Sequence, residues 1–400
     1  MKKTAYAFEA MEGNASVVKN GTTVFAVACG SGIASIRLWF EGHDAPLVLD
    51  AQAGMGERVL LGIEPHRIAL HVNGMLMDEE WPCGAPLFGD LSEAEGSLPI
   101  KRTEAPETDH DVRGGVCRMF TGAAHIRRPG VNIGDCMPFA ERDGRYHLFY
   151  LYDRHHHRSK WGLGAHQWAH VSTSDFVTWA EHPMAIAVTE PWEGSICTGS
   201  ILKVEERYWA WYAVRMSDGS PARLACAQSV DSYHFQKGGH SFILPHAYEP
   251  TSARDPKVFA FDGAYHMLVT TSLTENGCGC LAHLTSPDME QWSDCGAMMV
   301  QKNGTQPECP DWFELGGLYY LVYSIDGIGH YCVSSRPFDG WSVPAEDTVP
   351  CGTVPKCAFL NERLVFMGFQ GEGGYGGSLI ASEATQAPDG TLRFQTLALQ

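Results

Sequence analysis

A strand that recurs at long, regular intervals is the feature of this chain that most constrains its fold. Similar apolar strands follow one another with the aligned positions Tyr146, Tyr208, Tyr265, Tyr319 and Leu364, at intervals of 62, 57, 54 and 45 residues. A serine followed five or six residues later by an aromatic residue comes after each of the first four strands, as at Ser174 and Trp179. Units of this length, each with several short strands and Gly/Asp turns, are typical of propeller blades.

The sequence therefore predicts an all-β chain whose larger part is a five-bladed β-propeller at residues 113–400. A two-sheet sandwich is the second interpretation, but its strands would recur every 8–12 residues without the longer period. Residues 1–88 alternate polar and apolar side chains, and Asn73-Gly74 is a hairpin signal. We expect a small N-terminal β-sandwich there, similar to lectin-like jelly rolls, and a polar linker at residues 89–112.

Three acids stand ten or eleven residues ahead of the aligned tyrosines, namely Asp135, Asp255 and Glu308. If the strands are copies of one unit, these carboxylates occupy equivalent positions around a common axis and converge at the mouth of the central channel. Three acids in one pocket suggest glycosidic chemistry. The alternative is that Asp135 and Asp255 are ordinary turn acids, since aspartate is common in turns.

Composition limits the partners of the protein. The formal net charge is −18 with only 29 Lys plus Arg, which argues against a nucleic acid or an anionic membrane as partner. No run approaches the roughly 20 apolar residues of a membrane span, and no targeting segment is evident. Thirteen cysteines, an odd number, predict reduced thiols and a cytoplasmic location. The predicted partner is a small saccharide, and a homo-oligomer is compatible with the sequence, which does not determine the oligomeric state.

The propeller part of the chain resembles glycoside hydrolase family 32, the invertase, levanase and inulinase family, over about 230 of the 400 residues. That family folds as a five-bladed propeller with three acidic motifs. Its Trp-Gly-His-Ala-Thr-Ser segment resembles Trp161-Gly162 followed by Trp168-Ala169-His170-Val171-Ser172, and its Ser-Gly-Ser motif resembles Thr198-Gly199-Ser200. The stretches Arg254-Asp255-Pro256 and Glu308-Cys309-Pro310-Asp311 match their motifs directly.

The resemblance implies a role for each matching residue. Asp135 would be the nucleophile that attacks the anomeric carbon of a furanosyl unit, usually fructose, to form a covalent glycosyl-enzyme. Glu308 would protonate the leaving oxygen and then activate water, and Asp255 would stabilise the oxocarbenium-like transition state. Arg254, Trp161, Thr198 and His170 are the candidate substrate-binding residues. The implied chemistry requires no metal and no cofactor.

Two positions depart from the family pattern. Gly134 stands where the family has an asparagine beside the nucleophile, and Leu151 stands where it has a glutamine. A site built to hydrogen-bond a hydroxyl discriminates strongly, so the loss of these two contacts should change which sugar fits.

Two further clusters contain residue types that can bind metals or undergo redox chemistry. The histidines of the His155–His157 loop could bind zinc, but we favour a polar loop at the pocket rim, where Arg154 and Arg158 would suit an anionic group such as a phosphorylated sugar. Cys278-Gly279-Cys280 does not have Cys-x-x-Cys spacing, which favours small buried thiols over redox or metal chemistry.

Two functions from other classes stay open. One is an inverting propeller glycosidase acting on arabinose or xylose polymers, which the product anomer would distinguish. The other is a non-catalytic carbohydrate-binding protein, which retention of all three acids argues against.

Overall fold

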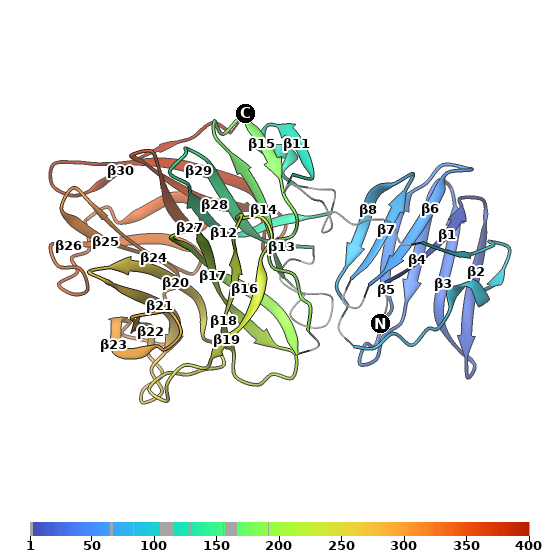
Figure 1. Cartoon of the computed structure of the whole chain (residues 1–400), viewed down its shortest axis with the longest axis horizontal. Helices are drawn as coiled ribbons and strands as arrows, with labels where there is room; N and C mark the ends of the chain where they lie inside the picture. The colour runs from blue at the N-terminus through green and yellow to red at the C-terminus, as the bar shows by residue number, and fades with distance from the viewer. Residues whose placement is uncertain are drawn as a thin grey trace. The chain divides into compact units, whose positions relative to one another are not determined.

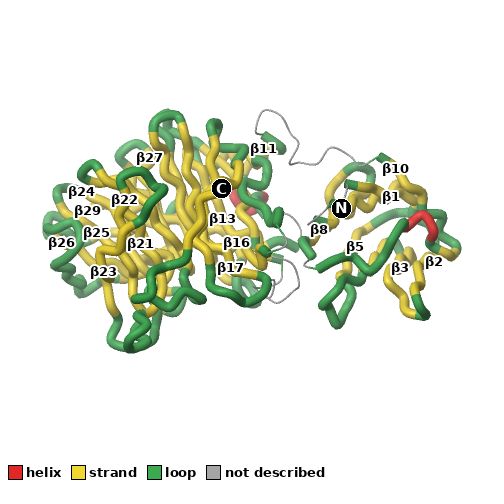
Figure 2. Tube along the Cα trace, turned by 60° about the horizontal axis from the view of Figure 1, so that its bottom comes forward, coloured by secondary structure: helices red, strands yellow, loops and turns green. Residues whose placement is uncertain are grey.

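The computed structural model describes residues 3–64, 67–82, 84–104, 116–127, 130–154, 156, 166–190 and 192–399. Strands dominate these residues, and their helical elements are single 3-10 turns (Figure 2). None of the helices in the described parts of the chain has the length and apolar character needed to cross a membrane. The chain divides into two compact units, the first built on residues 1–108 and the second on residues 109–157, 166–187 and 195–400.

The first unit is a sandwich of two five-stranded antiparallel sheets. One sheet has the order β10-β1-β6-β7-β8 and the other the order β5-β4-β3-β2-β9 (Figure 1). The strands are β1 (Thr4–Glu9), β2 (Gly13–Lys19), β3 (Thr22–Gly30), β4 (Ile33–Leu38), β5 (Leu47–Gln52), β6 (Arg58–Ile63), β7 (Ile68–Val72), β8 (Met75–Glu80), β9 (Glu95–Gly96) and β10 (Lys101–Thr103). Both sheets contribute to a single apolar core that contains Phe8, Phe25, Leu49 and Leu70.

The predicted hairpin at Asn73-Gly74 is present. Both residues have positive φ, 50° for Asn73 and 84° for Gly74, and they join β7 to β8 with Val72 paired to Met75. Two central residues with positive φ match the twist of the strands that they connect, which is why Asn-Gly marks such turns.

The predicted linker at residues 89–112 is wrong over its first half. A 3-10 turn, η1 (Leu91–Glu93), precedes β9 and β10, which pair with β2 and β1 at the edges of the two sheets. Leu91, Leu98 and Ile100 belong to the sandwich core. The sequence of this segment is mainly polar because only a few of its side chains face the core. Burial of those few side chains, together with edge pairing, orders the segment.

The second unit is the predicted propeller, with five blades of antiparallel strands. Blade one contains β11 (Arg118–Thr121), β12 (Asn132–Ala140), β13 (Tyr146–Asp153), β14 (Gln167–Thr173) and β15 (Thr178–Glu181), and blade two contains β16 (Glu193–Val204), β17 (Arg207–Met216), β18 (Arg223–Ser229) and β19 (Gln236–Phe242). Blade three contains β20 (Arg254–Phe261), β21 (Ala264–Ser272), β22 (Gly279–Ser286) and β23 (Ser293–Val300). Blade four contains β24 (Glu308–Leu315), β25 (Leu318–Ile325) and β26 (Ile328–Ser334), and blade five contains β27 (Thr348–Leu360), β28 (Arg363–Gly371), β29 (Gly377–Gln386) and β30 (Leu392–Thr396).

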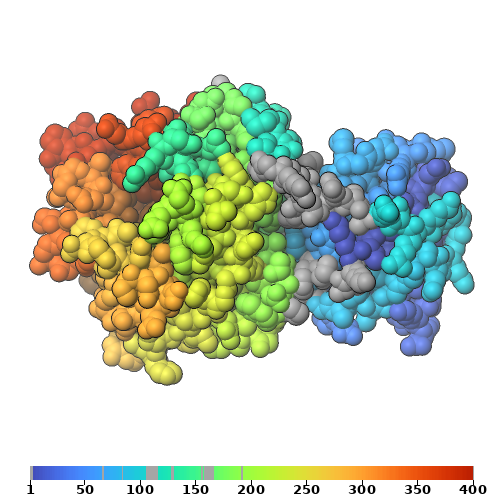
Figure 3. Space-filling view, viewed as in Figure 1, coloured from blue at the N-terminus to red at the C-terminus, as the bar shows by residue number. Residues whose placement is uncertain are grey.

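The repeat read from the sequence corresponds to the strand that pairs with the innermost strand of each blade. Tyr146 begins β13, and the other four aligned positions are the second residues of β17, β21, β25 and β28. The blades follow one another around the unit in chain order, from green through yellow and orange to red (Figure 3). Bridges from β12 to β29 and from β26 to β27 connect neighbouring blades.

Apolar side chains between blades hold the propeller together. Trp211 of blade two packs in one cluster with Val258, Met267 and Val269 of blade three. Tyr320 of blade four shares another cluster with blade five. This packing explains why the strands of the repeat are almost wholly apolar, because both of their faces are covered by neighbouring blades.

Candidate active site

The innermost strands of blades one, three and four bring the predicted acids together at the propeller axis. Asp135 lies on β12, Asp255 on β20 and Glu308 at the start of β24. A carboxylate oxygen of Asp135, a carboxylate oxygen of Asp255 and Sγ of Cys309 all lie within 4.8 Å of one another. Asp255 and Cys309 are buried, whereas Asp135 and Glu308 are partly exposed. Solvent therefore reaches Asp135 and Glu308 in part, whereas Asp255 is enclosed.

The three acids are not at the same phase of the repeat, and this corrects the sequence interpretation. Asp135, Asp255 and Cys309 each stand five residues before the inner-strand partner of the aligned tyrosine, which is Ala140, Ala260 or Glu314. Glu308 is one residue earlier, in the position that Arg254 has in blade three. The close ring around the axis is thus made of Asp135, Asp255 and Cys309, and Glu308 stands beside Arg254.

A β-bulge interrupts the inner strand at this level in four blades. The register shifts between Ile133 and Cys136, between Arg254 and Lys257, between Glu308 and Asp311, and between Thr353 and Lys356. Asp255, Cys309 and Val354 have φ of 56°, 49° and 42° inside these bulges, a region that non-glycine residues seldom adopt. Bulges re-aim side chains and are common beside active sites. These bulges allow consecutive residues of one strand, such as Arg254 and Asp255, to take part in the same cluster.

Hydrogen bonds hold both carboxylate oxygens of Asp135. The hydroxyl of Tyr375 donates to Oδ1 at 2.7 Å, and the hydroxyl of Thr198 donates to Oδ2. The thiol of Cys309 lies 3.5 Å from Oδ2. Donors on both oxygens fix the plane of the carboxylate, which suits a nucleophile that must meet an anomeric carbon along one direction.

Arg254 lies between the other two acids. Its Nη2 donates to Oε1 of Glu308 at 2.8 Å, and its Nε lies 3.7 Å from Oδ2 of Asp255. Burial raises the pKa of Glu308 above its ordinary value, against the lowering effect of Arg254. Burial also raises the pKa of Asp255, which Arg254 again opposes. A raised pKa is what a carboxyl group needs to act as a proton donor near neutral pH.

Asp311, Lys257 and Lys356 form a buried charge cluster. Asp311 accepts from Lys257 Nζ at 2.5 Å and from the backbone N–H of Cys357 at 3.0 Å. Lys356, which is 1% exposed, donates to the carbonyl of Pro310. Burial alone would raise the pKa of Asp311, but Lys257 and Lys356 outweigh it and lower the pKa. These charges connect the inner strands of blades three, four and five.

Comparison with known proteins agrees with this geometry. The family model described as the glycosyl hydrolases family 32 N-terminal domain matches residues 125–339, more than half of the chain. The chain belongs to glycosyl hydrolase family 32. The matched residues contain Asp135, Thr198, Arg254, Asp255 and Glu308, so all of these site residues lie within the family domain.

The relatives cover only part of this family 32 chain. It is 30% identical over 214 residues to the sucrose-6-phosphate hydrolase of Bacillus subtilis (strain 168), which is 51% of this chain and 43% of that protein. The solved structure of fructan 1-exohydrolase IIa from Cichorium intybus is similar in fold, with a TM-score of 0.58, 17% identity and coverage of 74% of this chain and 62% of that chain. A sucrose-6-phosphate hydrolase from Lactobacillus gasseri gives a TM-score of 0.57 at 16% identity, covering 66% and 60%. The chain therefore spans less than half the length of the Bacillus relative.

The described residues account for only part of the predicted site of this family 32 chain. Trp161, His155, His157 and Arg158 lie outside the described residues. His170 does not contact the acids in its described interactions. Its ring stacks on Phe149 with centroids 4.1 Å apart, and its Nε2 lies 2.9 Å from Nδ1 of His147. Burial lowers the pKa of His170 well below its usual value, which keeps the ring neutral. His170 is therefore placed as a packing residue of blades one and two.

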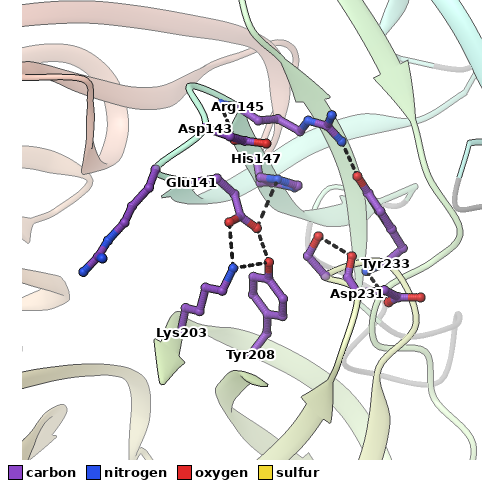
Figure 4. Close-up of a pocket in the computed structure, with 10 residues that line it drawn as sticks. Glu141, Asp143, Arg145, His147, Lys203, Tyr208, Asp231 and Tyr233 are labelled. Atoms are coloured by element: carbon purple, nitrogen blue, oxygen red, sulfur yellow. Dashed lines mark hydrogen bonds and ion pairs between the residues drawn. The ribbon is translucent and has the colours of Figure 1, made fainter. Parts of the chain in front are cut away.

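A separate pocket of about 390 Å³ lies beyond the other end of β12, away from Asp135. Lys203 and Tyr208 point at the carboxylate of Glu141, and the side chain of Arg145 reaches Tyr233 (Figure 4). His147 also lines this pocket, and burial lowers its pKa to about 3. The lining mixes cations and anions, of which Lys203 and Glu141 form an ion pair at 3.0 Å.

Sequence reasoning missed two residues of the site. Tyr375 comes from the glycine-rich turn between β28 and β29 and is 240 residues from the aspartate that it contacts. Gln306 accepts from Nη1 of Arg254 and donates to Ser252 and Ser272, which holds the arginine in place. The only local signal for Tyr375 was an aromatic residue set among glycines, which a surface turn would also explain.

The same ring could be considered for metal binding. Asp135, Asp255 and Cys309 are the one group of three metal-type ligands this close together among the described residues. Both carboxylates already accept hydrogen bonds, Asp135 from Tyr375 and Thr198, and Asp255 from the backbone N–H of Cys309 at 3.0 Å. Hydrogen-bond donors of the protein therefore already occupy oxygens of both carboxylates.

Proposed function

We propose that this chain is a retaining glycoside hydrolase that cleaves a β-fructofuranosidic bond in small saccharides through a covalent glycosyl-enzyme. The observation that carries the proposal is that Asp135 lies close to Asp255, while Arg254 joins Asp255 to Glu308, so that the three acids form one cluster, each in a different environment. Membership of family 32 supports the furanosidic substrate class. The names of the relatives support small fructosides such as sucrose or its 6-phosphate.

In the proposed reaction each of the site residues has a distinct role. Asp135 attacks the anomeric carbon while Glu308 gives its proton to the leaving oxygen, so the glycosidic bond breaks as the ester bond to Asp135 forms. Glu308, now a carboxylate, takes a proton from water, and the resulting attack releases the sugar and frees Asp135. Asp255 stabilises the positive charge that develops on the ring, and Arg254 keeps both neighbouring carboxyls oriented.

The experiment is a substrate panel with the first-formed anomer followed by NMR. The panel contains sucrose, sucrose 6-phosphate, fructo-oligosaccharides, difructose anhydrides, arabinosides and xylosides. Wild type is compared with Asp135→Asn and with Asp262→Asn, a control in an exposed turn. We expect fructose to be released with retention by wild type and by the control variant, and not by Asp135→Asn.

Other results would redirect the assignment. Inversion of the anomer, with arabinose or xylose released, would support the inverting propeller glycosidase. Sugar binding in calorimetry without turnover of any compound would support a carbohydrate-binding protein. The cytoplasmic location stays a prediction from composition.

A further inference from the structure

Tyr375 reaches from blade five to the nucleophile position in blade one. Its hydroxyl donates to Oδ1 of Asp135 at 2.7 Å and accepts from the backbone N–H of the same residue at 3.0 Å. One phenol oxygen therefore holds both the side chain and the main chain of Asp135. Its single proton is committed to the carboxylate, so it cannot also donate to a sugar hydroxyl.

The absence of a side chain at Gly134 makes this contact possible. A Cβ atom at that position would lie 2.6 Å from Oη and 2.9 Å from Cε1 of Tyr375, and 3.0 Å from Cβ of Leu151. Contacts this short are not tolerated without a shift of the neighbouring groups. A side chain at position 134 and the present placement of Tyr375 thus exclude each other. The two departures from the family pattern, Gly134 and Leu151, line the same small space.

The ring of Tyr375 is held from several sides. It packs edge-on against Phe369, with centroids 5.1 Å apart, and stacks on His166 at 5.5 Å. His166 is itself fixed by a 2.8 Å contact between its Nε2 and Oδ1 of buried Asp153. Nδ1 of His156 lies 3.0 Å from the carbonyl oxygen of Tyr375. The phenol is therefore pre-oriented toward Asp135 by residues of blades one and five.

We propose that Tyr375 is a positioning residue for the nucleophile, and that Gly134 is glycine because the phenol occupies its side-chain space. The proposal rests on the proposed function, in which Asp135 attacks the anomeric carbon. Together with Thr198, the phenol sets the plane of the carboxylate and donates to it while it carries negative charge. The site thus uses a tyrosine from blade five where the family pattern has a side chain next to the nucleophile.

The first test compares Tyr375→Phe with Tyr320→Phe. Each substitution removes a hydroxyl that donates one hydrogen bond and accepts another, but Tyr320 donates to the carbonyl of Gly390 and accepts from Nε2 of Gln386, remote from the acids. Phenylalanine keeps the ring contacts with Phe369 and His166. We expect Tyr375→Phe to lower kcat roughly tenfold to a hundredfold with little change in KM, the size of a hydrogen bond to a charged group. The rate of glycosyl-enzyme formation in a single turnover should fall by the same factor. Equal kcat values for the two variants would overturn the positioning role.

The second test needs no substrate. Gly134→Ala is made in wild type and in Tyr375→Ala, and the melting temperature of each protein is measured. We expect Gly134→Ala to lower Tm in wild type and to have little effect when Tyr375 is already removed. The same loss in both backgrounds would overturn the claim that the two side chains compete for space. Absence of turnover by wild type on every sugar would count against the proposed function instead, and this second test would still stand.

Discussion

The guanidinium of Arg254 donates from Nη2 to Oε1 of Glu308 at 2.8 Å and so joins the acidic motifs of blades three and four. Burial raises the pKa of Glu308, and Arg254 opposes that rise. Removal of the cation should therefore raise the pKa of Glu308 further. Because a general acid works only while protonated, the alkaline limb of kcat against pH should move to higher pH in Arg254→Gln.

The pH profile of Arg254→Gln is compared with that of Arg363→Gln, which loses a surface pair with Glu383. An unchanged alkaline limb in Arg254→Gln, with wild-type behaviour in the control, would show that Glu308 is not the group that titrates.

The loss of activity on removal of the proton donor Glu308 should depend on the leaving group of the substrate. We expect Glu308→Gln to lower kcat/KM for an unactivated fructoside by about 10²- to 10⁴-fold, the usual contribution of general acid catalysis. The loss should be much smaller for a substrate whose leaving group needs no proton. Glu314→Gln, on the exposed face of the same strand, is the control. Equal losses on both substrates would contradict the role of Glu308 as acid.

Asp311 should matter for stability more than for chemistry. Asp311→Asn leaves Lys257 and Lys356 without their buried counter-charge, and breaking such a pair typically costs about 3–5 kcal/mol. Urea denaturation measures the free energy of unfolding, with Asp326→Asn in an exposed turn as control. A change within error of that control would mean that the cluster does not stabilise the propeller.

The same cluster predicts a dependence of stability on acid. Lys257 and Lys356 outweigh burial and hold the pKa of Asp311 below its ordinary value of 3.8. Its stabilising contribution is therefore complete above that value and is lost as the pH falls from 3.8 through the lowered pKa. Asp311→Asn should lack this part of the acid-induced loss of stability, which denaturation at a series of pH values would detect.

Gly199, in the Thr198-Gly199-Ser200 stretch, should tolerate no side chain. A Cβ atom there would overlap the carbonyl oxygen of Trp211 and lie 2.9 Å from Cα of Tyr212, both in the backbone of the neighbouring strand. We expect Gly199→Ala to cost roughly 1–3 kcal/mol by overpacking. Gly239→Ala, where nothing lies within 4 Å of the added atom, is the matched control in the same blade. Equal unfolding free energies for the two variants would contradict this packing.

The repeat and most of the site residues can be recognised from local sequence patterns. The strands at Tyr146, Tyr208, Tyr265, Tyr319 and Leu364 are contiguous segments whose composition follows from burial between blades, so the pattern can be read locally. The short motifs around Asp135, Asp255 and Glu308 are likewise local, because each of these acids lies on the inner strand of its own blade. That is why five blades and three acids could be predicted before the structure was known.

Which of these residues contact one another depends on how the blades pack in three dimensions. Blade packing and the repeated bulges put Cys309 rather than Glu308 at the phase of Asp135 and Asp255. β10 belongs to the sandwich because it pairs with the edge strand β1. His170 packs against Phe149 instead of facing the acids. The contact between Tyr375 and Asp135 joins residues 240 positions apart, and it depends on the absence of a side chain at Gly134. Local sequence patterns specify strands and turns, but contacts of this kind arise only when closure of the propeller brings its first and last blades together.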